Sequence, residues 1–124
     1  MFFTRIPVPA SLPYSSQLLN RALRFFPLVG MLVGVLGAGV LWMALLVFPP
    51  PLALVVSMGA TILITGAFHE DGFADFCDGY GGGMSTERIL EIMKDSRLGT
   101  YGTLGLLAML AAKYAALASL PPPA

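Results

Sequence analysis

The sequence predicts an all-α protein, a polytopic transmembrane helix bundle with about three spans in this chain and one cytoplasmic amphipathic helix. Three observations predict this class. First, 56% of the residues are hydrophobic and only 11% are charged, whereas an average soluble domain carries about 25% charged residues. Second, residues 25–69 contain no Asp, Glu, Lys or Arg. Third, all seven acidic residues lie between positions 70 and 95, so negative charge is confined to one segment.

Apolar runs long enough to cross a bilayer define the expected spans. Residues 28–48 are uncharged, and about 20 residues are needed to cross the hydrocarbon layer. Residues 52–68 form a second uncharged run, and residues 104–120 form a third that contains one lysine. The proline triplet at 49–51 is expected to end the first helix, because proline supplies no backbone donor. Residues 15–26 have helical apolar spacing, which predicts either a short helix at the membrane surface or the flank of the first span.

The charged segment 69–103 is expected to face the cytoplasm. Arg21 and Arg24 precede the first span, three bases lie between the second and third spans, and the turn between the first two spans has none. The positive-inside rule therefore places the N-terminus and the acidic segment on the cytoplasmic side. Within this segment, residues 85–95 have a serine in capping position and an apolar stripe at helical spacing, which predicts an amphipathic helix.

Three aspartates have the spacing of one helix face. If the helix of the second span continues past residue 69, Asp71, Asp75 and Asp78 occupy positions i, i+4 and i+7 and share an arc of roughly 60°. Carboxylates so close together repel one another, and a bound cation relieves that repulsion. Oxygen ligands without a thiolate pair favour a hard ion, Mg²⁺ or alternatively Mn²⁺. The other interpretation is a solvated acidic segment paired with the nearby bases.

A second polar group follows the amphipathic helix. Lys94, Asp95 and Arg97 bring two bases and an acid to its C-terminal end. Arginine suits bidentate recognition of phosphate, and lysine suits a point-charge contact. An ordinary helix end, where bases interact favourably with the last carbonyls, explains the same residues equally well.

Two polar motifs resemble those of a known enzyme family. His-Glu-Asp-Gly-Phe-Ala-Asp-Phe-Cys-Asp-Gly at 69–79 and Arg-Ile-Leu-Glu-Ile-Met-Lys-Asp-Ser-Arg-Leu-Gly-Thr at 88–100 look like those of adenosylcobinamide-GDP ribazoletransferase, the cobalamin synthase. Phe-Thr-Arg-Ile-Pro-Val-Pro at 3–9 and Phe-Pro-Leu-Val-Gly at 26–30 resemble that family's opening. The resemblance implies a multi-pass enzyme of the bacterial inner membrane. Such an enzyme joins adenosylcobinamide-GDP to α-ribazole or its phosphate, with magnesium and with release of GMP.

The resemblance also implies roles for the polar residues. The metal would lie against the diphosphate of the substrate, and three aspartates would hold it: Asp71, Asp75 and Asp78. Asp95 would be a further ligand or would position the attacking ribazole hydroxyl, while Lys94, Arg97 and Lys113 would steady the phosphates. Positioning and charge neutralisation do most of the work in phosphoryl transfer, so this set of residues is adequate.

The extent of the resemblance sets the expected domain organisation and partners. Members of that family are longer and have further spans and a second polar region. We therefore expect residues 1–124 to form a single membrane domain, the N-terminal part of a longer enzyme. The expected partners are adenosylcobinamide-GDP, α-ribazole and the lipid bilayer. No nucleic acid is expected, and a homo-oligomer is left open.

Two other functions remain open at this point. A lipid synthase of the CDP-alcohol phosphatidyltransferase type also uses carboxylates at membrane helix ends. Its pattern places Ala-Arg two residues after Asp-Gly, whereas Gly72 is followed here by Phe-Ala-Asp; Glu87 and Glu91 copy its later spacing with glutamates. A subunit of a cation transporter is the non-enzyme alternative. It would favour acids buried in mid-span, whereas these acids are expected at the end of a span.

Overall fold

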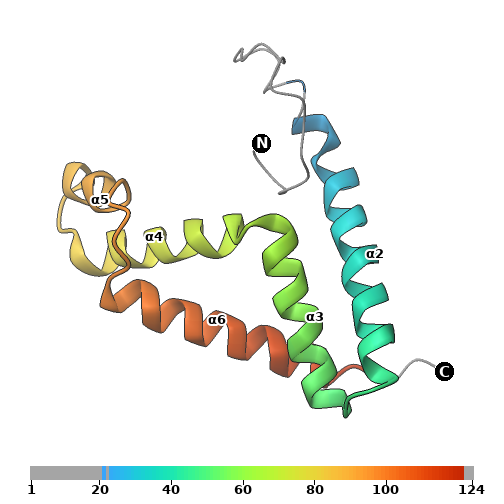
Figure 1. The fold of residues 1–124 in the computed structure, drawn as a ribbon. Helices are drawn as coiled ribbons and strands as arrows, with labels where there is room; N and C mark the ends of the chain where they lie inside the picture. The colour runs from blue at the N-terminus through green and yellow to red at the C-terminus, as the bar shows by residue number, and fades with distance from the viewer. Residues whose placement is uncertain (1–20, 22, 122–124) are drawn as a thin grey trace. The chain divides into compact units, whose positions relative to one another are not determined.

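The computed structural model describes residue 21 and residues 23–121, and every regular element in this part of the chain is a helix. In chain order these are the 3-10 helix η1 (Leu23–Phe25) and the α-helices α2 (Phe26–Leu45), α3 (Pro50–Thr65), α4 (Phe68–Gly82), α5 (Thr86–Ile92) and α6 (Thr100–Ala118), shown in Figure 1. The predicted all-α class is confirmed. The chain divides into two compact units, Met1–Gly66 and Ala67–Ala124, which we call the first and second units.

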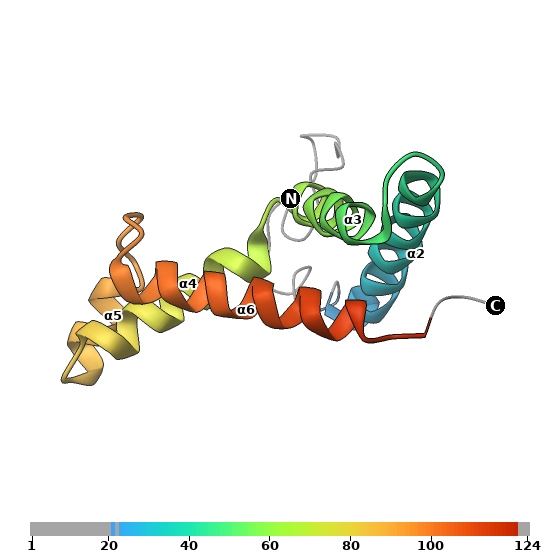
Figure 2. The ribbon, with the colours of Figure 1, turned by 90° about the horizontal axis from the view of Figure 1, so that it is seen from below.

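In the first unit, α2 and α3 pack side by side as an antiparallel pair (Figures 1 and 2). Gly37 permits the close approach, because a Cβ atom at this position would lie 2.7 Å from Cγ2 of Thr61. The hydroxyl of Ser57 donates a 2.8 Å hydrogen bond to the carbonyl oxygen of Gly37. Small residues and hydroxyl bonds of this kind hold helices together where lipid removes the hydrophobic driving force.

The outer surface of α2 is apolar. Trp42 is 67% exposed and Met31 is 66% exposed, and a helix that is apolar all round is typical of a membrane span. By length and composition, two stretches of the described residues can cross a membrane, Leu23–Leu45 and Thr100–Ala118, and the number rises to three if α3 and α4 together form one broken span. The expectation of a helical membrane protein is therefore confirmed.

The second expected span, residues 52–68, differs from the observed helix. α3 ends at Thr65 after 16 residues, which is about 24 Å and less than the ~30 Å hydrocarbon layer. Gly66 at φ 69° and Ala67 at φ 60° then adopt left-handed backbone conformations. A left-handed residue terminates a helix. The helix of the second apolar run therefore does not continue past residue 69, and α4 is a separate helix.

The prolines at 49–51 begin α3 and do not end α2. α2 already ends at Leu45, and the prolines occupy the N-cap and the first turn of α3. Proline is tolerated there because the missing N–H would have no partner within the helix in any case. The short helix expected at 15–26 lies mostly outside the described residues; within them, Leu23–Phe25 form η1.

In the second unit, α4 and α6 lie side by side, and α5 folds against the C-terminal end of α4 (Figures 1 and 2). Gly105 of α6 lies against Cys77 of α4, since a Cβ atom at residue 105 would be 3.1 Å from that of Cys77. The amphipathic helix expected at 85–95 is α5. It is shorter than expected because Met93 is its C-cap residue, and the chain then turns toward α6.

Candidate functional site

α4 carries the three aspartates of the predicted acidic face. The helix is continuous from Phe68 to Gly82, so Asp71, Asp75 and Asp78 do occupy positions i, i+4 and i+7 of one helix. Their surroundings differ. Asp71 is exposed, Asp75 is half-buried, and Asp78 is buried with 9% exposure. One end of the acidic face is therefore accessible, and the other end lies inside the second unit.

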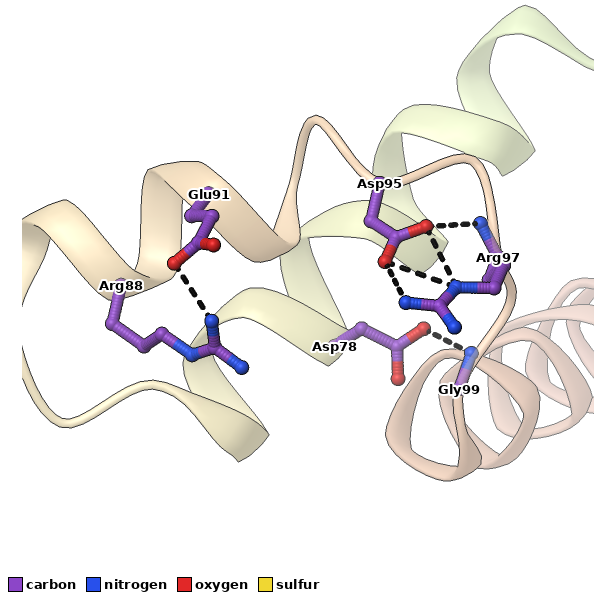
Figure 3. A network of polar contacts seen from close by, with 6 residues as sticks. All are labelled: Asp78, Arg88, Glu91, Asp95, Arg97 and Gly99. Carbon is purple, nitrogen blue, oxygen red and sulfur yellow. Dashed lines mark hydrogen bonds and ion pairs between the residues drawn. The ribbon is translucent and has the colours of Figure 1, made fainter.

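The buried aspartate is bonded to the N-terminus of α6. Oδ2 of Asp78 accepts a 2.7 Å hydrogen bond from the backbone N–H of Gly99 (Figure 3), and Oδ1 accepts one of 2.7 Å from the N–H of Gly102. Gly99 is the N-cap residue of α6 and provides no side-chain cap. The first N–H groups of a helix have no partner within it, and negative charge near them is favourable. A carboxylate from α4 therefore caps α6.

Two glycines make room for this carboxylate. A Cβ atom at residue 99 would lie 2.8 Å from Cγ of Asp78, and a Cβ atom at residue 102 would lie 2.9 Å from it. Any larger residue at either position would displace the carboxylate. Our sequence reasoning missed both glycines. Their signal was present, because glycine recurs at 99, 102 and 105, and small residues at helical spacing indicate close helix packing.

Asp95 and Arg97 form a closed pair in the connection between α5 and α6 (Figure 3). Nε of Arg97 donates to both carboxylate oxygens of Asp95 at 3.1 Å, Nη2 donates to Oδ2 at 2.6 Å, and the backbone N–H of Arg97 donates to Oδ1 at 3.1 Å. These hydrogen bonds lower the pKa of the Asp95 carboxyl and raise the pKa of the Arg97 guanidinium. An exposed pair adds little stability, but it fixes where the guanidinium lies.

The remaining bases are placed differently. Lys94 is exposed and directly precedes Asp95 in the same connection. Arg88 forms an ion pair of 2.7 Å with Glu91 on the exposed side of α5. Lys113 is exposed on α6, about 16 Å further along the helix axis than Gly102. α6 therefore carries Lys113 away from the capping contact, and the bases nearest to it in the chain are those of the connection between α5 and α6.

Two of the three aspartates would be able to hold a magnesium ion that binds together with a substrate phosphate. Among residue 21 and residues 23–121, no three His, Cys, Asp or Glu side chains come together as a preformed metal site. Asp78 already uses both carboxylate oxygens for backbone donors. Asp71 and Asp75 remain, one turn apart, and Mg²⁺ is usually held by one or two carboxylates completed by water and substrate phosphate. The ligand set of three aspartates stays a prediction.

Sequence comparison connects these residues with known proteins. The sequence profile of the cobalamin-5-phosphate synthase (CobS) family matches residues 1–124. The chain belongs to this family. The resemblance inferred from the two polar motifs is therefore confirmed, and the match includes both the aspartates of α4 and the connection between α5 and α6.

Three curated relatives are each named adenosylcobinamide-GDP ribazoletransferase. The chain is 52% identical over 119 residues to the protein of Vibrio parahaemolyticus, 55% over 119 residues to that of Shewanella amazonensis, and 52% over 122 residues to that of Ralstonia pickettii. These matches cover 96%, 96% and 98% of the chain but only 45%, 46% and 48% of the relatives. The chain thus spans about half the length of the curated relatives it matches. No solved structure matches it.

Proposed function

We propose that the second unit carries the metal- and phosphate-binding residues of an adenosylcobinamide-GDP ribazoletransferase. Such an enzyme joins adenosylcobinamide-GDP to α-ribazole or its phosphate and releases GMP. Family membership and the names of the relatives support this activity over the lipid-synthase and transporter alternatives. The observation that carries the proposal is that the second unit contains both the exposed Asp71 and half-buried Asp75 of α4 and a guanidinium that Asp95 holds in place.

The proposed reaction is a substitution at phosphorus. The ribazole hydroxyl oxygen forms a bond to the phosphorus on the cobinamide side of the diphosphate, and its proton passes to water. The bond between this phosphorus and the bridging oxygen breaks, and GMP leaves with that oxygen. Bound magnesium supplies neutralisation of the diphosphate charge, and Asp71 and Asp75 would hold it. Arg97 and Lys94 would contact phosphate oxygens, and Asp95 would keep the guanidinium oriented.

The proposal also includes a location for the protein. We place the protein in the bacterial inner membrane, with the acidic segment on the cytoplasmic side, where nucleotide substrates are made. The distribution of bases favours this side, since Arg88, Lys94 and Arg97 all lie in the segment between α4 and α6. A cysteine introduced at the exposed Glu87 is then expected to react with an impermeant maleimide only after spheroplasts are opened.

The test is GMP release by the protein expressed from its complete reading frame and reconstituted in liposomes. With magnesium, adenosylcobinamide-GDP and α-ribazole, we expect GMP release that stops when the metal is chelated. Asp75→Asn is expected to lower the rate roughly 100-fold or more, because a charge that stabilises the transition state is lost. Glu87→Gln is the matched control, since it makes the same change at an exposed position of α5, and it is expected to keep the wild-type rate.

Two results would contradict the proposal. Absence of GMP release from folded, inserted wild-type protein would exclude the ribazoletransferase activity and would direct attention to CDP-alcohol substrates and to metal flux. Equal activity of Asp75→Asn and Glu87→Gln would place the chemistry away from α4.

A further inference from the structure

Asp78 is the residue whose structural surroundings differ most from its expected role. It belongs by spacing to the acidic face of α4, but its exposure is only 9%. Each of its two carboxylate oxygens accepts a backbone hydrogen bond of 2.7 Å from α6. A carboxylate buried to this degree needs hydrogen-bond partners, and here both of its oxygens have one from the backbone of α6.

The connection between α5 and α6 is attached to α4 at both of its ends. At its start, Met93 packs on Gly79, because a Cβ atom at residue 79 would lie 2.8 Å from Cγ of Met93. At its end, Gly99 is bonded to Asp78. Two adjacent residues of α4 therefore hold the two ends of a short segment that contains Lys94, Asp95 and Arg97.

This attachment sets where the phosphate-binding bases lie. Asp75 precedes Asp78 by three residues, about 4.5 Å along the axis of α4. The capping contact thus places the end of the connection within about one helical turn of the half-buried Asp75. Figure 3 shows the Asp95–Arg97 pair on the chain just before Gly99, with Asp78 directed at that glycine. If the contact is broken, the second attachment at Met93 remains but the Arg97 end is released.

We infer that Asp78 is a positioning residue, which caps α6 and thereby holds the Lys94–Arg97 segment beside Asp75, and that it is not a magnesium ligand. The inference rests on the proposed function for its catalytic consequence, but its structural part does not. The glycines at 99 and 102 are part of the same capping contact, since the Asp78 carboxylate fits only where both residues lack a Cβ atom. Changing a glycine should therefore reproduce the effect of changing the aspartate.

The first measurement is trypsin cleavage after Lys94 and Arg97 in detergent, without metal or substrate. Cleavage of a folded protein requires local opening of the segment, so its rate reports how firmly the segment is held. Asp78→Asn leaves one N–H facing an amide NH₂ group, and Gly102→Ala pushes the carboxylate away. Both variants should be cleaved about tenfold faster than wild type, and the double variant no faster than the worse single variant. Asp75→Asn and Gly39→Ala, which adds a Cβ in open space, should match wild type.

The second measurement is the magnesium dependence of GMP release by the same variants. Asp78→Asn and Gly102→Ala should lower the maximal rate at least tenfold and leave the magnesium concentration for half-maximal rate unchanged. Asp75→Asn should raise that concentration. If a variant only lost folded protein, its maximal rate would fall in proportion to the folded fraction. Its magnesium concentration for half-maximal rate would not change.

The outcomes decide between the two roles. Wild-type cleavage of Asp78→Asn, together with a tenfold or larger rise in its half-saturating magnesium concentration, would make Asp78 a ligand and overturn the inference. Cleavage of Gly102→Ala at the rate of Gly39→Ala would also overturn it, and this variant decides the question if Asp78→Asn fails to fold. If wild type releases no GMP, the proposed function fails, while the cleavage rates still test the positioning role.

Discussion

The helices inside the first unit and those inside the second unit pack through different kinds of contact. The first unit has no acidic residue, and α2 and α3 meet through Gly37, Ser57 and Thr61, with a hydrogen bond from the Ser57 hydroxyl to the Gly37 carbonyl. The second unit contains all seven acidic residues, and its helices α4 and α6 meet through the buried carboxylate of Asp78. Both units use glycines for close approach. In the first unit a glycine admits another helix, whereas in the second it admits a charged group.

The difference shows that the apolar helices suited to membrane insertion and the charged residues proposed for chemistry lie in different units of the chain. An uncharged hairpin enters lipid at little cost, while each charged residue in a membrane helix costs about 2.5–3.5 kcal/mol on insertion scales. Charged side chains are therefore tolerated only where they are hydrogen-bonded or exposed to water. In the second unit, Asp78 is bonded, and Asp71 lies exposed. The comparison predicts that steric changes dominate in the first unit and polar changes in the second.

The largest effect in the first unit should come from filling its closest contact. Gly37→Leu places a side chain where Thr61 already lies, and we expect a loss of about 1–3 kcal/mol in the free energy of unfolding. At Gly34, on the same helix, an added Cβ atom meets nothing within 4 Å, so Gly34→Leu should be neutral. Thermal unfolding in detergent measures both. Equal losses in the two variants would mean that α2 and α3 are not held by this contact.

A smaller effect of opposite sign is expected at Ala67. This residue has a left-handed φ of 60°, which costs a non-glycine residue roughly 1–2 kcal/mol. Ala67→Gly removes that cost and adds a smaller entropic cost in the unfolded chain. We therefore expect a gain of about 0.5–1 kcal/mol in unfolding free energy. Ala111→Gly inside α6 should instead lose about 1 kcal/mol. A loss at both positions would show that the left-handed conformation is not retained in detergent.

The smallest effect should come from the exposed ion pair of α5. Arg88 and Glu91 are 58% and 69% exposed in their side chains, and such pairs contribute little because water and salt screen them. Arg88→Gln should change the unfolding free energy by less than about 0.5 kcal/mol, far less than Asp78→Asn. A loss of more than about 1 kcal/mol on chemical denaturation would show that charges of the second unit contribute regardless of burial.

Hydropathy and spacing predicted most of the helices among the described residues, but not all of their boundaries. The apolar runs predicted α2 and α6, and the i, i+4, i+7 spacing predicted that Asp71, Asp75 and Asp78 share a helix. The prolines at 49–51 were misassigned because proline both ends a preceding helix and fits the first turn of the next. The left-handed break at Gly66 and Ala67 was not foreseen, since alanine ordinarily favours a continuous helix.

The sequence predicted which residues belong to the candidate site but only part of how they contact one another. Both polar motifs were recognised, but their spacing does not reveal which atoms meet across 21 or 24 residues of chain, as Asp78 does with Gly99 and Gly102. Contacts of this range depend on how α4 packs against α6. The Asp95–Arg97 pair is local and could have been found from its spacing of two residues.

The cap on α6 also sets an order of events during synthesis of the protein. Asp78 precedes its partner Gly99 by 21 residues, and at roughly 5–20 residues per second the ribosome needs about one to four seconds to add them. Throughout that interval the Asp78 carboxylate has no backbone donor from α6, and a polar group without a hydrogen-bond partner is costly to bury. The buried environment of Asp78 is therefore complete only after the N-terminal turn of α6 has been made. The packing of α4 against α6 is therefore completed late in the synthesis of this part of the chain.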